Sequence, residues 1–471
     1  DNKVMYLNYN PLQTNKDLDT LLDRIENAQY VLLGEASHGT SEFYKWRIEI
    51  SKKLIQEKGF SFIAVEGDWP DCFRVNKYIK GISNSVKNGY EVLKSFNRWP
   101  TWMWANKEMV ELVEWLKEYN DTLINQQRQS EAVDKPPLVG FYGLDLYSLW
   151  ESMEAIIDYL KKVDPSALKE AIEAYNCFEP YNKNVEEYAR ATAFVPQNCE
   201  DEIIQLLILM QSKRDIYSKD HGKNIEEEYF DVEQNAITAK DAEQYYRTMI
   251  NGDVNSWNLR DTHMMSTLER LMDFYQKENN KKRIPKAIVW AHNTHIGDAR
   301  FTDMKRSGMI NLGQLVRAKK GQKNTVLIGF STYNGTVIAA REWGANMEIM
   351  KLPSAIEGSW DSILHNIEYM QHDKKQTDKI IVFDQRLENT VMGMEDMQDD
   401  TSDKEYGKNR GQRAIGVVYN PVYERYGNYV PTILSSRYDA LIFIDNTNAL
   451  FPLYIKSSED RDLPETFPTG V

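Results

Sequence analysis

Side chains capable of acid–base chemistry follow directly on short apolar runs at several places in the sequence. The stretch VLLGEASHG, residues 31–39, is apolar at first and then brings Glu35, Ser37 and His38 close together. Four further runs end in the same way, and the polar residues after them are Glu66 with Asp68, Asp145, His292 with His295, and Ser331 with Tyr333. A single strand must end in polar loop residues for structural reasons alone. Five such ends that carry three histidines and several carboxylates are more typical of a reaction site.

These histidines suit proton transfer. A neutral imidazole can act as a general base near neutral pH, and a nearby carboxylate orients the ring and stabilises its protonated form. His38, His292 and His295 are therefore candidate catalytic residues, with Glu35 and Glu66 as the carboxylates beside them. The other histidines lie in helical or polar contexts typical of a structural role, and they are His221, His263, His365 and His372.

The same residues permit two other kinds of chemistry. His38, Glu66 and His292 could bind a divalent metal, and the HNTH stretch at 292–295 has an i, i+3 spacing that two ligands can use. Ser37 could be a nucleophile, but adjacent residues on an extended chain point in opposite directions, so His38 is poorly placed to activate it. The GxSxG, HExxH, GxxxxGKS/T and GxGxxG motifs are absent. Without a metal, the same residues suit a histidine base that deprotonates water, so both kinds of chemistry stay open at this point.

The helix expected between Thr40 and Gly59 carries an arginine on its apolar side. Helical spacing places Arg47 within the stripe formed by Phe43, Trp46, Ile50 and Leu54. A buried arginine needs a carboxylate partner or an anionic ligand, and Glu35 or Glu66 could supply the carboxylate. The alternative is that Arg47 lies at the edge of the stripe and reaches solvent.

Short runs rich in Val, Ile, Leu and Phe predict the buried strands that would position these residues. They begin at residues 30, 60, 138, 286 and 325, with later runs at 414–419 and 440–445. Helical patterns separate the first runs, which predicts an α/β fold with a central, mainly parallel sheet flanked by helices. In such a sheet the carboxyl ends of the strands meet at one edge, where ligands bind, so the polar strand ends would converge on one site.

The region 148–280 is almost wholly helical in pattern, and it predicts a large helical insertion, or lid, between two strands of the sheet. The expected division is an α/β catalytic core formed by residues 1–147 and 281–471, and an insertion of residues 148–280. The polar segments 121–137 and 394–411 are expected to be exposed loops.

Composition narrows the class of partner and the compartment. The net charge of -14 at pH 7 argues against binding to nucleic acid or to an anionic membrane surface. No apolar run approaches the roughly 20 residues of a membrane span. Three cysteines without a CxxC pair argue against a disulfide framework and favour a cytoplasmic location.

Several spaced motifs, in order along the chain, resemble those of the erythromycin esterase family, which includes bacterial proteins described as succinoglycan-biosynthesis-like. They are GEASHGTSEFY, AVEGDWPD, RWPTWMW, YGLDLYS, WNLRD and WAHNTHIGD. The resemblance implies metal-independent hydrolysis of an ester, and in the antibiotic-resistance members the ester is the macrolactone of a macrolide. It further implies that His38 is the base that activates water, and it matches the family's other site residues to Glu35, Glu66, Arg47, His292 and His295.

Other matching positions are expected to support or bind the substrate. Asp145, Arg260 and Asp261 lie within the matched motifs. Trp69, Trp102 and Trp104 could line an apolar cleft for a bulky ligand, or they could equally be aromatic core. We therefore expect a hydrolase of small-molecule carboxylic esters or lactones. The alternatives are a metal-dependent hydrolase that uses the same residues and a non-catalytic ligand-binding relative.

Overall fold

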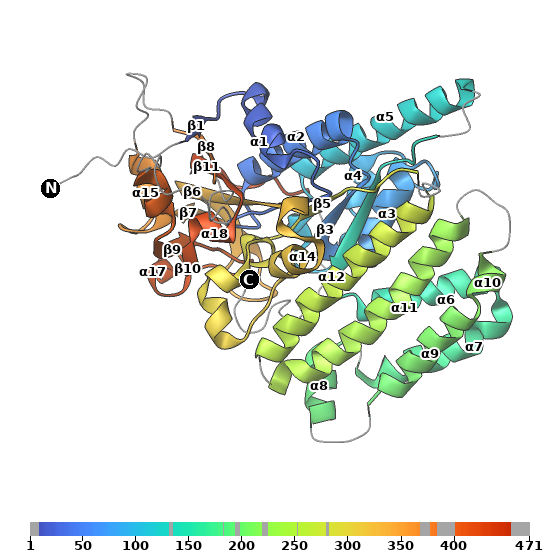
Figure 1. Ribbon diagram of the computed structural model, residues 1–471. Helices are drawn as coiled ribbons and strands as arrows, with labels where there is room; N and C mark the ends of the chain where they lie inside the picture. Colours follow the sequence, from blue (N-terminus) through green and yellow to red (C-terminus); the bar gives the residue numbers. More distant parts are fainter. Residues whose placement is uncertain are drawn as a thin grey trace.

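The computed structural model of the chain describes residues 9–453 apart from 131–134, 182, 194–197, 219–224, 252, 279–281, 368–376 and 384–400. At its centre lies a sheet with the strand order β1-β8-β11-β6-β2-β5-β3-β4, and β7 pairs with β6 outside this path (Figure 1). The strands are β1 (Asn10–Pro11), β2 (Tyr30–Leu33), β3 (Phe62–Asp68), β4 (Gly140–Asp145), β5 (Ala287–Trp290), β6 (Thr325–Ala340), β7 (Met347–Leu352), β8 (Lys379–Val382) and β11 (Ala440–Thr447). Strands β9 (Asn409–Arg413) and β10 (Tyr429–Ile433) form a separate antiparallel pair.

The strands from β11 to β4 in this order run parallel, and the antiparallel pairs of this sheet among the described residues involve β1, β7 and β8. The prediction of an α/β fold with a mainly parallel sheet is confirmed. Along β2, Val31 and Leu33 pack into the core on one face of the sheet, and Tyr30 and Leu32 pack into the core on the other. Because helices cover both faces, the strand is an uninterrupted apolar run.

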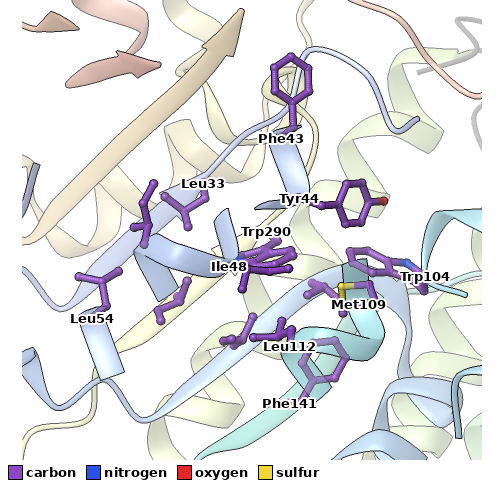
Figure 2. Close-up of a cluster of buried hydrophobic side chains, with 14 of the residues drawn as sticks. Leu33, Phe43, Tyr44, Ile48, Leu54, Trp104, Met109, Leu112, Phe141 and Trp290 are labelled. Carbon is purple, nitrogen blue, oxygen red and sulfur yellow. The ribbon is translucent and has the colours of Figure 1, made fainter. Parts of the chain in front are cut away.

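Two layers of helices cover the sheet. The first core lies under α1 (Asp19–Ile25), α2 (Ser41–Lys58) and α5 (Lys107–Gln129), and the second under α12 (Asp253–Glu278), α14 (Leu312–Lys320) and α15 (Trp360–Asn366). Figure 2 shows part of the first core, where side chains of α2, α5 and the central strands pack together. The other helices outside the region between β4 and β5 are α3 (Trp69–Ile79), α4 (Gly89–Leu93), α13 (Asn293–Ile296), α16 (Thr401–Tyr406), α17 (Glu424–Gly427) and α18 (Leu434–Arg437).

Between β4 and β5 the described residues contain only helices. They are α6 (Leu149–Val163), α7 (Leu168–Phe178), α8 (Val185–Ala193), α9 (Glu200–Ser212), α10 (Arg214–Tyr217), α11 (Ile225–Thr248) and α12, together with three short 3-10 helices at Pro165–Ala167, Glu179–Tyr181 and Met249–Asn251. An apolar cluster of its own joins α6 to α11, whereas Met264, Leu268 and Leu271 of α12 pack on the sheet. The division into a core and an insertion at residues 148 and 280 stays a prediction.

Two segments expected to be loops form regular structure. Residues 121–129 continue α5, which extends past the sheet at the edge of the molecule (Figure 1). Their polar composition reflects a helix end that has little to pack against, because Gln, Arg and Asn are compatible with an exposed helix. Of the segment 394–411, residues 394–400 lie outside the described residues, and the rest contains α16 and the start of β9.

The apolar run at 414–419 is not a strand of the sheet. Only isolated bridges, Ser37 to Ile415 and Ala340 to Val418, connect it to its neighbours. The segment passes beside the residues that follow β2, and Ile415 is fully buried there. Its apolar composition therefore reflects burial over the sheet edge and not a place in the sheet.

The cysteines are not expected to form a disulfide framework, but two of the three form one disulfide. Cys177 at the end of α7 is bonded to Cys199 next to α9, and Cys72 is free and buried. The two cysteines are 22 residues apart in the sequence, and no motif connects them that could have predicted this pair. The preference for a cytoplasmic location rested on the absence of such a bond. Among the described helices, none is both long and apolar enough to cross a membrane.

Candidate active site at the carboxyl edge of the sheet

Four neighbouring parallel strands bring the predicted residues to one edge of the sheet. Glu35 follows β2, Glu66 lies in β3, Asp145 ends β4 and His292 follows β5. Hydrogen bonds and ion pairs then connect these strand ends to one another and to α12. Ser331 does not join them, because β6 continues to Ala340 and the Ser331 hydroxyl donates instead to Asp361.

Glu35 connects His38 to Arg47. One carboxylate oxygen lies 2.5 Å from Nδ1 of His38, and the other accepts a hydrogen bond of 2.7 Å from Nη2 of Arg47. All three side chains are buried, so Arg47 does not reach solvent. Because a carboxylate can only accept a hydrogen bond, Nδ1 of His38 carries the proton, and the basic lone pair of the neutral ring lies on Nε2.

Two aromatic rings hold Arg47 behind Glu35. Its guanidinium carbon lies 4.7 Å from the ring centroid of Tyr44 and 4.5 Å from that of Trp290. Figure 2 labels both rings, which lie close together in the core beside α2. The faces of aromatic rings attract cations. The position of Arg47 therefore suits it to hold the Glu35 carboxylate, and not to reach into a cleft.

Glu66 is the centre of a second network. Its Oε2 accepts the backbone N–H of His292 at 2.9 Å, and its Oε1 lies 2.9 Å from Nη2 of Arg260 and 3.1 Å from Nε2 of His295. Burial alone would raise the pKa of Glu66, but the charges of His295, His38 and Arg260 outweigh burial and hold that pKa well below its usual range. Glu66 is therefore ionised at neutral pH.

His295 is a buried cation between two carboxylates. Its Nδ1 lies 2.9 Å from Asp261, and its ring stacks on Trp257 with 4.6 Å between the centroids. Burial alone would lower the pKa of His295, but Asp261 and Glu66 raise it to about 9. A histidine that is already protonated at pH 7 cannot accept a proton from water. This contact makes Asp261 a partner of His295.

His292 is held as a neutral ring. The backbone N–H of Thr294 donates to its Nδ1 at 3.2 Å, so the ring proton lies on Nε2 and is donated to the carbonyl of Ile415 at 3.1 Å. Burial lowers the pKa of His292 well below its usual value, and a proton on His38 would lower it further. The two rings are close, with 5.0 Å between the centroids of His38 and His292. Both nitrogens of His292 thus have partners within the protein.

Asp145 and Arg260 form the side of the site next to β4. Arg260 donates to both oxygens of Asp145, at 3.0 and 2.7 Å, while its Nη1 has no hydrogen-bond partner among the described residues. A cavity of about 20 Å³, enough for about one water molecule, is lined by both Glu66 and Asp145. Trp104 also lines it and donates to the Glu66 carbonyl at 3.2 Å.

The other two tryptophans lie in the apolar cores. Trp69 stacks on Phe73 and Tyr142, and its indole N–H donates to Asp231 of α11. Trp102 is 3% exposed and belongs to the first core. Neither lines the cavity beside Glu66. This placement favours the alternative that both are aromatic core, and leaves Trp104 as the tryptophan beside the site.

The geometry changes the residues that could hold a metal. Among the described residues, the acidic and histidine ligand atoms that lie within 4.8 Å of one another belong to Glu35, His38 and Glu66. His292, which the sequence suggested as a ligand, is not in this group because its ring nitrogens contact Thr294 and Ile415. In Glu35 both oxygens already have partners, and Nδ1 of His38 is one of them.

Among the ionised side chains of the site there is one more carboxylate than there are cations. The ionised groups are four carboxylates and three cations, namely Glu35, Glu66, Asp145 and Asp261 against Arg47, Arg260 and His295. With His38 neutral the buried cluster has a net charge of about -1, and a proton on His38 would bring it to zero.

Sequence reasoning missed the residues that act through the backbone or through ring faces. Ile415 contributes only its carbonyl oxygen, and Tyr44, Trp257 and Trp290 contribute aromatic faces, so none of them carries a motif for acid–base chemistry. Outside the site, His263 pairs with Asp241 and His365 with Asp445, as expected for structural histidines. His221 and His372 lie outside the described residues.

Comparison with known proteins agrees with the arrangement of motifs. The chain is 24% identical over 349 residues to YbfO of Bacillus subtilis, which carries a provisional hydrolase name, and the match covers 68% of this chain and 69% of that protein. It is 22% identical over 366 residues to erythromycin esterase type II of Escherichia coli, covering 73% of this chain and 79% of that protein. A crystal structure described as a succinoglycan biosynthesis protein shares the fold, with a TM-score of 0.68 at 22% identity over 94% of this chain and 95% of that chain. The family model described as Erythromycin esterase matches residues 55–447, and the chain belongs to the erythromycin esterase family.

Proposed function

We propose that the protein hydrolyses a carboxylic ester or a lactone, with His38 as the general base for an attacking water molecule. The observation that carries this proposal is the contact of His38 with Glu35, 2.5 Å long, which leaves Nε2 as the basic atom of the ring. Membership of the erythromycin esterase family supports hydrolysis in general, and two of the similar proteins have hydrolase or esterase names.

In the proposed reaction, Nε2 of His38 takes a proton from water as the water oxygen adds to the acyl carbon. Glu35 stabilises the imidazolium that forms, and Arg47 keeps Glu35 ionised and in place. The tetrahedral intermediate then breaks its bond to the alkoxide, and the imidazolium returns the proton to that leaving oxygen. One ester and one water give one acid and one alcohol, and His38 ends neutral.

The developing negative charge on the carbonyl oxygen needs a positive partner. Arg47 and His292 are poorly suited to this role, because aromatic rings enclose Arg47 and protein partners occupy both nitrogens of His292. Both arginines have a guanidinium nitrogen without a hydrogen-bond partner among the described residues, but Arg260 is the better candidate because its neighbours Glu66 and Asp145 line the cavity.

A hydrolysis screen by mass spectrometry tests the proposal, with macrolides, simple lactones and acylated sugars as substrates. His38→Ala should lower kcat by about 10²- to 10⁴-fold, the usual contribution of a general base. The matched control is His263→Ala, because His263 is equally buried and its Nδ1 lies 2.6 Å from Asp241, but it belongs to α12 outside the site. Equal turnover by His38→Ala and wild type would refute the assignment.

Ser37→Ala separates attack by water from covalent catalysis. The Ser37 hydroxyl is 2.6 Å from that of Thr40 and accepts the Gly39 N–H, so it has no base beside it. This variant should therefore keep its activity, whereas a serine nucleophile would require its loss.

A metal-dependent reaction is the second candidate, because ligand atoms of Glu35, His38 and Glu66 lie within 4.8 Å of one another. A divalent ion held there would lower the pKa of a bound water and supply hydroxide. Elemental analysis of the purified protein, with activity measured before and after chelation, distinguishes the two candidates. Stoichiometric metal together with loss of activity on chelation would favour the metal.

A further inference from the structure

A second hollow lies next to the candidate active site, between α3, α6 and α11, and Asp71 lines both this hollow and the small cavity beside Glu66. These helices lie side by side where the helical region meets the sheet (Figure 1). The groove has a volume of about 570 Å³. Its charged lining comprises six carboxylates and three cations, namely Asp71, Glu151, Glu154, Asp158, Glu228 and Asp231 with Arg74, Lys77 and Lys162.

The carboxylates on the deeper wall lack sufficient positive partners. Glu151 forms no ion pair with any described residue, and Asp231 accepts hydrogen bonds only from the neutral groups of Trp69 and Asn235. Burial raises the pKa of Glu151 to about 7 and that of Asp231 to about 6. Asp71 has Arg74 as its partner, and burial nevertheless raises its pKa to about 7. These raised pKa values mean that burial disfavours the charged form of each carboxyl group, and a cationic ligand beside them would stabilise that form.

An unused acceptor lies on the same wall. Asn235 is 1% exposed, and its side-chain amide donates to the backbone oxygen and to the carboxylate of Asp231, at 3.1 and 3.0 Å. Both partners are acceptors, so the nitrogen of the amide is correctly assigned, and its oxygen has no hydrogen-bond partner among the described residues. A buried acceptor without a partner costs about 1–3 kcal/mol in a typical protein, which a donating ligand would recover. The groove therefore contains a buried acceptor without a donor, and its lining has three more carboxylates than cations.

The spacing of the acceptors favours an organic cation over a metal ion. A metal needs several ligand atoms close together, and the group of described residues that meets this condition is the one at Glu35, His38 and Glu66. In the groove the acceptors come from three different helices, with Asp71 on α3, Glu151 on α6 and Asn235 on α11. An elongated molecule with more than one ammonium group can reach acceptors that are spread in this way.

We propose that this groove, next to the candidate active site, is a second binding site, which binds an organic polyamine through Glu151, Asp231 and Asn235. One ammonium group pairs with Glu151, and another donates to Asp231 and to the amide oxygen of Asn235. Two of the three cations of the lining have other contacts, because Arg74 pairs with Asp71 and Lys77 lies over the ring of Phe73. The site does not depend on the proposed hydrolysis, and binding can be measured without any substrate.

Isothermal titration calorimetry with spermidine tests the site on the full-length protein. Saturable binding with one molecule per chain is expected, and Glu151→Gln should weaken it by about tenfold or more, because an ion pair with a desolvated carboxylate is lost. Glu118→Gln is the matched control, since it removes the same charge from an exposed position on α5 outside the groove and should leave the affinity unchanged. A second variant, Glu151→Lys, places an ammonium group in the groove and should abolish binding.

Two results would overturn the proposal. If Glu118→Gln weakens binding as much as Glu151→Gln does, spermidine is attracted only by the net negative charge of the protein. If Mg²⁺ competes with spermidine at an equal concentration, the groove does not select an organic cation. Thermal unfolding of each variant without ligand checks that Glu151→Gln is folded, and a normal melting temperature together with lost binding supports the proposed site.

Discussion

The charge on His295 makes the stability of the fold depend on pH within a defined window. Its pKa is about 9 in the folded protein because Asp261 and Glu66 stabilise the imidazolium, and it is about 6.5 in an unfolded chain. Each pKa unit corresponds to about 1.4 kcal/mol, so His295 contributes about 3 kcal/mol when it is protonated. Because the folded pKa is the higher one, this contribution is fully present below about pH 6.5 and is lost as the pH rises through about 9.

Urea unfolding at several values between pH 6 and pH 9.5, followed by tryptophan fluorescence, measures this effect. The comparison is between the wild-type protein and His295→Gln, which cannot titrate. Between these limits the wild type should lose about 3 kcal/mol more of its free energy of unfolding than the variant does. Asp71 and Glu151, whose raised pKa values also fall near this window, are present in both proteins and cancel in the difference.

The variant should also be less stable than the wild type at pH 6, by about 3–5 kcal/mol, because Asp261 and Glu66 lose a buried charged partner. Equal dependence on pH in the two proteins would mean that His295 is neutral in the folded state. That result would refute both the ion pairs argued for Glu66 and the net charge assigned to the site.

Three further changes test other parts of the fold. Arg47→Met should lower the free energy of unfolding by about 3–5 kcal/mol, because it leaves Glu35 without its buried partner. Lys53→Met, at an exposed ion pair, should lower it by less than about 1 kcal/mol. Similar losses for the two variants in urea titrations would contradict this prediction. Replacing Cys177 and Cys199 with serine should lower the free energy of unfolding by about 3 kcal/mol, as expected for a loop of this length. The melting temperature of this variant should no longer depend on reductant. Three free thiols in the unfolded wild type would contradict the disulfide. Gly39→Ala should destabilise the protein by about 1–3 kcal/mol in the same titration, because a Cβ there would lie 1.9 Å from the Ile338 carbonyl oxygen, and no loss would show that the backbone can shift.

Much of the site could be predicted because it depends on local periodicity. The apolar run before Glu35 and the polar burst after it define the end of β2, and parallel strands necessarily bring such ends together. Arg47 could be placed on a buried face because the helical period fixes its position relative to Phe43 and Ile50. Whether Arg47 pairs with Glu35 or with Glu66 depends on side-chain geometry, which the helical period does not determine.

Contacts between distant segments could not be predicted in this way. The pairing of His295 with Asp261 depends on how α12 packs against the sheet, and the contact of His292 with Ile415 depends on a segment that resembles a strand but crosses over the sheet edge. The disulfide likewise depends on the packing of α7 and α9. Each of these features is fixed by tertiary packing, for which a single sequence carries no periodic pattern.

The different surroundings of three similar histidines give each of them a different capacity for proton transfer. His295 lies between two carboxylates and is protonated at neutral pH, so it cannot accept a proton. His292 is held neutral by burial, which lowers its pKa, and backbone groups engage both of its nitrogens. His38 has a single carboxylate at Nδ1, within a cluster whose net charge a proton would neutralise. Because environments that separate the titration of neighbouring groups also separate their roles, His38 is the histidine of the three that is suited both to take a proton from water and to return it to a leaving group.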